Sequence, residues 1–182
     1  HAGNIDALGE YVALADSLGA TMNFSLLSAS VENDDLAAVL PDDAALERLA
    51  QATLALSRDG VPVLSDTPVS TRLTTTCGCG AGCTMVSVSA DGEVFPCHMM
   101  HDEAFSLGSL LEDSGCLAAR HAPAPRVAEL GACADCDIRY LCGGGCRARA
   151  YFATGDVEAR DPYCSLMRTF YRLLFEAMLG RN

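Results

Sequence analysis

The most informative part of this sequence is the stretch Cys133-Ala-Asp-Cys136-Asp-Ile-Arg-Tyr-Leu-Cys142-Gly-Gly-Gly-Cys146. Its four cysteines fall within fourteen residues, at the intervals C-x2-C-x5-C-x3-C. The three consecutive glycines allow backbone angles that residues with a side chain resist, and they let the main chain approach a bulky group closely. The segment is therefore predicted to wrap around an inorganic centre and to lend one thiolate to a second centre nearby.

All ten cysteines of the chain lie after residue 76. An even number would allow a disulfide framework, but no secretory signal peptide is visible, and thiols in the cytosol stay reduced. In that compartment, dense C-x2-C spacing indicates metal ligation. The sequence therefore predicts a cytoplasmic protein that binds metal through its thiols.

Two kinds of centre compete for these thiols. Zinc takes four ligands, which two cysteine pairs of the opening stretch could supply. Iron–sulfur clusters take four cysteines each, so two clusters would use eight of the ten. Clusters are favoured because a single zinc site in the opening stretch leaves most other thiols without a use, among them Cys77, Cys79, Cys83, Cys97 and Cys164. A zinc- or cluster-binding interaction module without catalysis stays open as an alternative.

Composition narrows the class of protein. Half of the 182 residues are apolar, which predicts a globular chain, and no apolar run approaches the roughly 20 residues that span a bilayer. The net charge of −12 argues against a nucleic-acid partner. It fits a solvated surface or a field that steers a basic peptide. The chain starts at His1 inside a predicted helix, so we expect it to be a piece of a longer protein.

The first half of the sequence predicts helix, strand and helix. Apolar periodicity predicts a helix over 4–19, capped by Asn4, and a strand over 20–27. Pro41-Asp42-Asp43 begins a second helix, to about residue 58. This order is typical of the helix–strand steps of a barrel. The Pro- and Thr-rich residues 61–76 then mark a domain boundary.

The second half predicts a hairpin and three helices. Residues 84–90 and 93–96 alternate apolar and polar around an Asp-Gly turn, which is a hairpin signal. Because a hairpin returns its ends to one place, the thiols before and after it can share a site. Helices are predicted over 106–120, over 146–154 and from Asp161 onward, the last with a buried apolar stripe.

Three features accompany the opening stretch: Cys79-Gly-Ala-Gly-Cys83, the segment Phe95-Pro-Cys97-His98 and a lone Cys164. Together they make residues 77 to about 178 resemble the SPASM domain of radical S-adenosylmethionine enzymes. The resemblance implies an α/β fold. The last helix–strand units of a partial (β/α) barrel would occupy residues 1–70, and a small cysteine-rich α+β domain with a β-hairpin and two auxiliary [4Fe–4S] sites would occupy 71–182.

The resemblance also implies an interlaced set of cluster ligands. One auxiliary cluster would be held by Cys133, Cys136, Cys142 and Cys164, and the other by Cys97 and Cys146 with thiols from the 77–83 segment. There the family uses either a cysteine at position 79 or a pair at positions 77 and 83, and both patterns are present. With Cys79 alone, this second cluster would have an open iron site for a substrate thiol. Cys116 has no place in the pattern and is expected to be an ordinary thiol.

One departure from the family pattern matters. The catalytic cluster of such enzymes sits on C-x3-C-x2-C near the start of the barrel, and no such triplet occurs here, because position 86 is a valine. S-adenosylmethionine and a third [4Fe–4S] cluster are therefore expected in a missing N-terminal part, where the 5′-deoxyadenosyl radical would form. No catalytic residue is assigned in this chain.

The resemblance is strongest to maturases that install thioether or carbon–carbon cross-links in a ribosomally made precursor peptide. The implied partners are that peptide and a reductant such as flavodoxin or ferredoxin, with no nucleic acid and no membrane. A radical S-adenosylmethionine enzyme that acts on a haem precursor or another small molecule is the enzymatic alternative, because the run after Cys146 is similar to such members.

Some neighbours of the cysteines have two interpretations. His98 is either a hydrogen-bond donor to cluster sulfur or a packing residue. Arg147 and Arg149 either compensate the charge of a cluster or form salt bridges with Asp156 or Glu158. Tyr140 and Leu141 are expected to screen the cluster from water.

Overall fold

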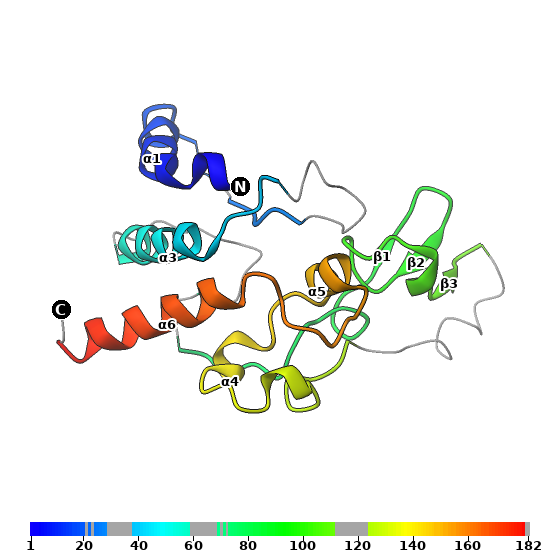
Figure 1. Ribbon diagram of the computed structural model, residues 1–182. Helices are drawn as coiled ribbons and strands as arrows, with labels where there is room; N and C mark the ends of the chain where they lie inside the picture. Colours follow the sequence, from blue (N-terminus) through cyan, green and yellow to red (C-terminus); the bar gives the residue numbers. More distant parts are fainter. Residues whose placement is uncertain are drawn as a thin grey trace.

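The computed structural model describes residues 1–20, 22, 24–28, 38–58, 69, 71, 73–111 and 124–180. Long helices gather at one end of the molecule and a small sheet lies at the other, with short helices between them (Figure 1). This mixed composition of helices with a small sheet agrees with the predicted α/β class.

The chain opens with a 3-10 helix, Ala2–Ala7, that runs into α1, Leu8–Ser17. The predicted cap Asn4 is wrong, because the ring of His1 takes that role and accepts the Gly3 N–H over 3.0 Å. The Asn4 carboxamide instead accepts a hydrogen bond from the terminal amine of His1. Gly19, at φ 61°, ends the helical segment as predicted.

The strand predicted over 20–27 is not formed by its described residues, which include a single bridge at Phe24. A strand needs a neighbouring strand to pair its N–H and C=O groups, and the described chain supplies no ladder there. Helix α3 follows at Asp43–Arg58, and Asp42 caps it by accepting the Ala45 N–H over 2.8 Å. This second helix is therefore confirmed, whereas most of the predicted boundary over 61–76 lies outside the described residues.

Helix α6, Cys164–Met178, packs against α3 and forms the main core. The predicted stripe is buried at Leu166, Phe170 and Leu174, although its last member Met178 is exposed. Burying each such side chain contributes roughly 1.5–3 kcal/mol. Residues of the cysteine-rich stretch pack against this same core: Cys136, Ile138, Leu141 and Cys142. The core thus fixes the cysteine stretch against the start of α6.

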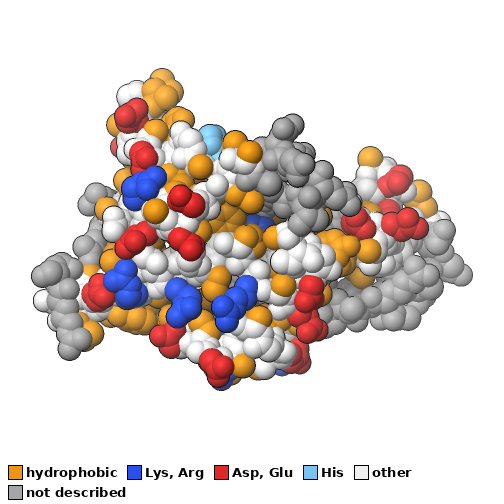
Figure 2. All heavy atoms as spheres, viewed as in Figure 1, with side chains coloured by type: hydrophobic (Ala, Val, Ile, Leu, Met, Phe, Trp, Pro, Cys, Tyr) orange, Lys and Arg blue, Asp and Glu red, His pale blue; other side chains and the backbone are white. Residues whose placement is uncertain are grey.

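Charged side chains of both signs are interspersed over the helical part of the molecule (Figure 2). Exposed ion pairs join Arg48 to Asp6 over 3.0 Å, and Arg172 to Glu176 over 3.1 Å. Pairs of this kind contribute about 0–1 kcal/mol, so the core and not the surface charge holds these helices together. None of the described helices combines the length and apolar character that crossing a bilayer requires.

The predicted hairpin is present as β1, Ser87–Val88, and β2, Glu93–Phe95, which pair antiparallel around the Asp-Gly turn. A third strand, β3, Gly108–Ser109, pairs with the other edge of β2. The helix predicted over 106–120 is therefore wrong in its described part, because the main chain there bonds to β2: Leu107 N–H donates to Val94 and Leu110 N–H to Gly92.

Candidate metal centre: two groups of thiols

Four thiols line one cavity between the cysteine stretch and the start of α6. They come from the end of the 3-10 helix Gly131–Cys133 and the turn after it, from the end of helix α4, Arg139–Cys142, and from the first residue of α6. We call Cys133, Cys136, Cys142 and Cys164 the pocket thiols. Ile138 and Met167 supply the apolar part of the wall. These are the four cysteines that the family resemblance assigns to one cluster.

The glycines after α4 are needed for this arrangement. Gly143, Gly144 and Gly145 have φ of 68°, 86° and 73°, which strains any residue that carries a Cβ. A Cβ on Gly144 would lie 2.6 Å from Leu130, and one on Gly145 would lie 2.6 Å from the carboxylate of Asp161. The glycines thus approach Leu130 and Asp161 closely, and the predicted approach of this main chain to an inorganic centre stays a prediction.

Burial disfavours the thiolate form of two pocket thiols, Cys142 and Cys164. It raises the pKa of Cys142 to about 12, and the Cys142 thiol donates to the Met167 sulfur over 3.3 Å. Burial also raises the pKa of Cys164, an effect that the cations Arg160 and Arg168 oppose. Because metals bind the thiolate form, a positive centre must compensate this cost on binding.

The cavity of the pocket thiols measures about 20 Å³. This is about the room of one water molecule, so the sulfurs must move apart to admit an iron–sulfur cluster. The donor set itself, four thiols in an apolar wall, fits such a cluster. No three His, Cys, Asp or Glu side chains in the described part of the chain lie close enough together to hold a single metal ion.

A second group of thiols lies in a small apolar cluster beside the sheet. We call its members Cys79, Cys97 and Cys146 the hairpin thiols; they pack with Ala81, Met100 and Ala148. The main chain brings the 79–85 turn to the hairpin, because Gly82 N–H donates to the Pro96 carbonyl over 2.9 Å. Cys77 and Cys83 are exposed. Of the two patterns in the sequence, the packing therefore groups position 79 with Cys97 and Cys146.

The ring of His98 lies beside the sulfur of its neighbour Cys97. Its Nδ1 is 3.6 Å from Cys97 Sγ, and the Met99 N–H donates to the same sulfur over 3.5 Å. The nearby His101 stacks on Phe95 and bonds to Ser87 instead. A hydrogen bond from His98 to a cluster sulfur stays a prediction.

Asp161 joins the two groups of thiols, and the sequence did not reveal it as more than a helix start. It is 3% exposed, and its carboxylate accepts the Cys146 N–H over 2.6 Å. Arg149, equally buried, pairs with this carboxylate over 3.0 Å. The predicted salt bridges to Asp156 or Glu158 are therefore wrong, because helix α5, Arg147–Thr154, turns Arg149 inward toward Asp161.

Arg147 is a buried cation without a carboxylate partner in the part of the chain that the structure describes. It is 1% exposed, and its Nη1 donates to the carbonyls of Val157 and Ala159, each over 2.8 Å. Its Nη2 donates to the carbonyl of Gly144, which lines the cavity of the pocket thiols. Its Nε has no hydrogen-bond partner among these residues.

The water screen predicted at Tyr140 is wrong. Tyr140 is 45% exposed, and Arg139 lies over its ring, 4.8 Å from the centroid. The four-residue helix α4 points Leu141 toward the core and leaves its neighbour at the surface. Ile138 and Met167 line the cavity in its place.

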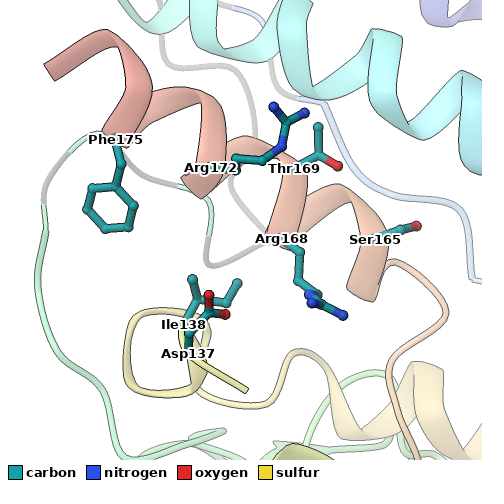
Figure 3. Close-up of a pocket in the computed structure, with 7 residues that line it drawn as sticks. All are labelled: Asp137, Ile138, Ser165, Arg168, Thr169, Arg172 and Phe175. Atoms are coloured by element: carbon teal, nitrogen blue, oxygen red, sulfur yellow. The ribbon is translucent and has the colours of Figure 1, made fainter. Parts of the chain in front are cut away.

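The nine cysteines that the structure describes are all free thiols, and Cys116 lies outside the described residues. A wider surface hollow of about 410 Å³ lies beside α6, but no thiol lines it. In Figure 3 the guanidinium group of Arg172 points toward α3 while that of Arg168 points away from it, so the hollow does not gather its charges around one point. The thiol groups are therefore the candidate site.

No family model matches the chain. Mycofactocin maturase MftC of Mycolicibacterium smegmatis is 29% identical over 174 residues, covering 88% of this chain and 44% of that protein. PqqA peptide cyclase of Granulibacter bethesdensis is 30% identical over 199 aligned positions, covering 100% of this chain and 52% of that protein. AdoMet-dependent heme synthase of Methanosarcina barkeri is 36% identical over 93 residues, covering 48% of this chain and 25% of that protein.

The fold is similar to that of a solved structure, native anSMEcpe with bound AdoMet. The TM-score is 0.64 over 98% of this chain and 54% of that chain, at 14% identity, so this likeness shows the fold alone. The chain spans about half the length of the curated relatives that match all or most of it. Fold and relatives together bear out the resemblance carried by the cysteines: the chain is a relative of the SPASM-type radical S-adenosylmethionine enzymes.

Proposed function

We propose that this chain is the C-terminal part of a radical S-adenosylmethionine enzyme that modifies a precursor peptide, and that it holds two auxiliary [4Fe–4S] clusters. The observation that carries the proposal is the convergence of Cys133, Cys136, Cys142 and Cys164 on one cavity, since these are the ligands the family pattern assigns to one cluster. Residues 1–70 would complete a partial (β/α) barrel, and 71–182 would form the auxiliary-cluster domain.

The pocket thiols would hold one cluster and the hairpin thiols the other, with the fourth position of the second cluster left to Cys77, Cys83 or a substrate thiol. When bound, such clusters accept an electron or hold a substrate sulfur. The chain's own residues supply thiolates, exclude water with Ile138 and Met167, and hold the Cys146 backbone at Asp161. The protein's share is therefore positioning and tuning.

The relatives named mycofactocin maturase and PqqA peptide cyclase support a peptide substrate. The match to AdoMet-dependent heme synthase favours the second candidate, a haem precursor, although it covers 48% of this chain. A thioether or carbon–carbon cross-link is the expected product on a peptide. Flavodoxin or ferredoxin would supply electrons.

Metal analysis of the anaerobically purified chain tests the proposal. We expect about eight irons with matching sulfide, since each [4Fe–4S] cluster brings about four. If the chain contains zinc and no sulfide, the enzyme proposal is wrong and the chain is a zinc-binding interaction module. The full-length enzyme, given S-adenosylmethionine, a reductant and a candidate precursor peptide, should change the peptide mass. If only a haem precursor is consumed, the second candidate holds.

A further inference from the structure

We infer that Asp161, held by Arg149, is a positioning residue shared by both groups of thiols, so that its loss loosens both sites at once. The inference rests on the proposed function only in taking these thiols as cluster ligands. Its geometric content is that the buried Asp161 carboxylate holds the backbone of the hairpin thiol Cys146 and that of Tyr163, the residue before the pocket thiol Cys164.

On the side of the hairpin thiols, Asp161 fixes the backbone of Cys146. Its Oδ2 accepts the Cys146 N–H over 2.6 Å. This N–H stands at the start of α5, where the first N–H groups of a helix have no partner within it. The residue before Cys146 is Gly145, whose missing Cβ leaves the room that the Asp161 carboxylate fills. The backbone N–H of Cys146 is thus held directly by this carboxylate.

On the side of the pocket thiols, Asp161 fixes the start of α6. Its backbone carbonyl accepts the Cys164 N–H over 2.9 Å, and its Oδ1 accepts the Tyr163 N–H over 2.8 Å. Asp161 also lines the cavity of the pocket thiols. Asp161 therefore positions Cys164 at the cavity and also positions Cys146, which directly follows the three glycines.

Arg149 holds the carboxylate in place. Its Nη2 and Nε lie 3.0 and 3.2 Å from Oδ2, and both side chains are at most 2% exposed. The guanidinium group lies over the ring of Tyr163, whose hydroxyl donates to the Leu27 carbonyl over 2.7 Å. A buried carboxylate without its cation would be strongly disfavoured, so the pair acts as one unit.

The test uses Asp161→Ala, Asp161→Asn and Arg149→Met, with Asp156→Ala as the matched control. Asp156 is exposed in the same loop, and its carboxylate also accepts a backbone N–H, from Glu158 over 2.8 Å. We expect Asp161→Ala and Arg149→Met to lower the iron content from about eight to fewer than about four atoms per chain, because ligands of both clusters would be displaced. Asp161→Asn, which keeps the shape and one acceptor oxygen, should retain more iron, and Asp156→Ala should retain all of it.

A second readout needs no cluster. In the reduced, metal-free protein, alkylation by iodoacetamide followed by peptide mass spectrometry measures how often each thiol becomes exposed to solvent. Asp161→Asn should speed the alkylation of both Cys146 and Cys164 by at least roughly threefold, with the exposed Cys83 unchanged. Far-UV circular dichroism checks that the helices persist, and if Asp161→Ala unfolds, the Asp161→Asn result decides.

The outcomes separate the inference from the function on which it rests. If wild-type protein binds no iron, the proposed clusters fall, while the alkylation rates still test the shared role of Asp161. If Asp161→Asn alters only one of the two thiols, or Asp161→Ala loses only one cluster, Asp161 belongs to a single site and the inference is overturned.

Discussion

The pocket thiols and the hairpin thiols differ in how the fold assembles them. The pocket thiols line one cavity whose walls are fixed by the α3–α6 core, and all four come from described residues. The hairpin thiols pack in a much smaller apolar cluster beside a sheet of short strands, with two further cysteines exposed next to them. The pocket thiols are thus positioned by a large core, whereas the hairpin thiols depend on a turn and a short hairpin.

Within this comparison, the largest expected effect is the loss of one whole site through Cys136→Ala. Because four thiolates would share one cluster, the variant should contain about four fewer irons per chain than wild type and keep the other cluster. Iron and sulfide analysis measures this, with Asp135→Ala, an exposed neighbour, as control. Unchanged iron would remove Cys136 from the pocket thiols.

A sharper comparison is Cys79→Ala against Cys83→Ala. Cys79 packs in the apolar cluster with Cys97 and Cys146, and Cys83 is exposed. We therefore expect Cys79→Ala to lose up to about four irons and Cys83→Ala to lose fewer than about one. The opposite result would show that the C-x5-C pair holds the cluster and that the turn rearranges on binding.

The smallest expected effect concerns Arg147, whose buried charge has no carboxylate partner among the described residues. A cation beside a cluster favours its reduced form. Arg147→Met should therefore lower a reduction potential by roughly 50 mV, about 1 kcal/mol for one electron. Spectroelectrochemical titration measures the potential, and the exposed Arg126→Met is the control. An unchanged potential in both clusters would leave Arg147 as a purely structural donor to Val157, Ala159 and Gly144.

Local signals predicted local structure well. The Asp-Gly turn predicted the hairpin, Asp42 predicted the start of α3, and the helix predicted over 146–154 is present as α5. Each of these depends on residues within a few positions of one another. The two-residue strand β3 was missed because so short a segment has no periodicity, and its pairing comes from the free edge of β2.

The family resemblance grouped the four pocket thiols, and the structure places them around one cavity. That they hold a cluster stays a prediction, and the residues that support them were not predicted. The pairing of Arg149 with Asp161 spans twelve positions and depends on how α5 meets the start of α6. The signal that could have found it is the pair of arginines in an otherwise apolar helix, since a buried cation requires an acceptor.

The three glycines Gly143–Gly145 have a further consequence for electron transfer. They alone connect Cys142, a pocket thiol, to Cys146, a hairpin thiol. Even a fully extended connection of this length places the two Cα atoms no more than about 14 Å apart. If each group of thiols held a cluster, charge added to one cluster at that range would act on the other by roughly 1 kcal/mol for an effective dielectric constant near 20. Reduction of one cluster would then make reduction of the other less favourable, so the two clusters would take up electrons one at a time.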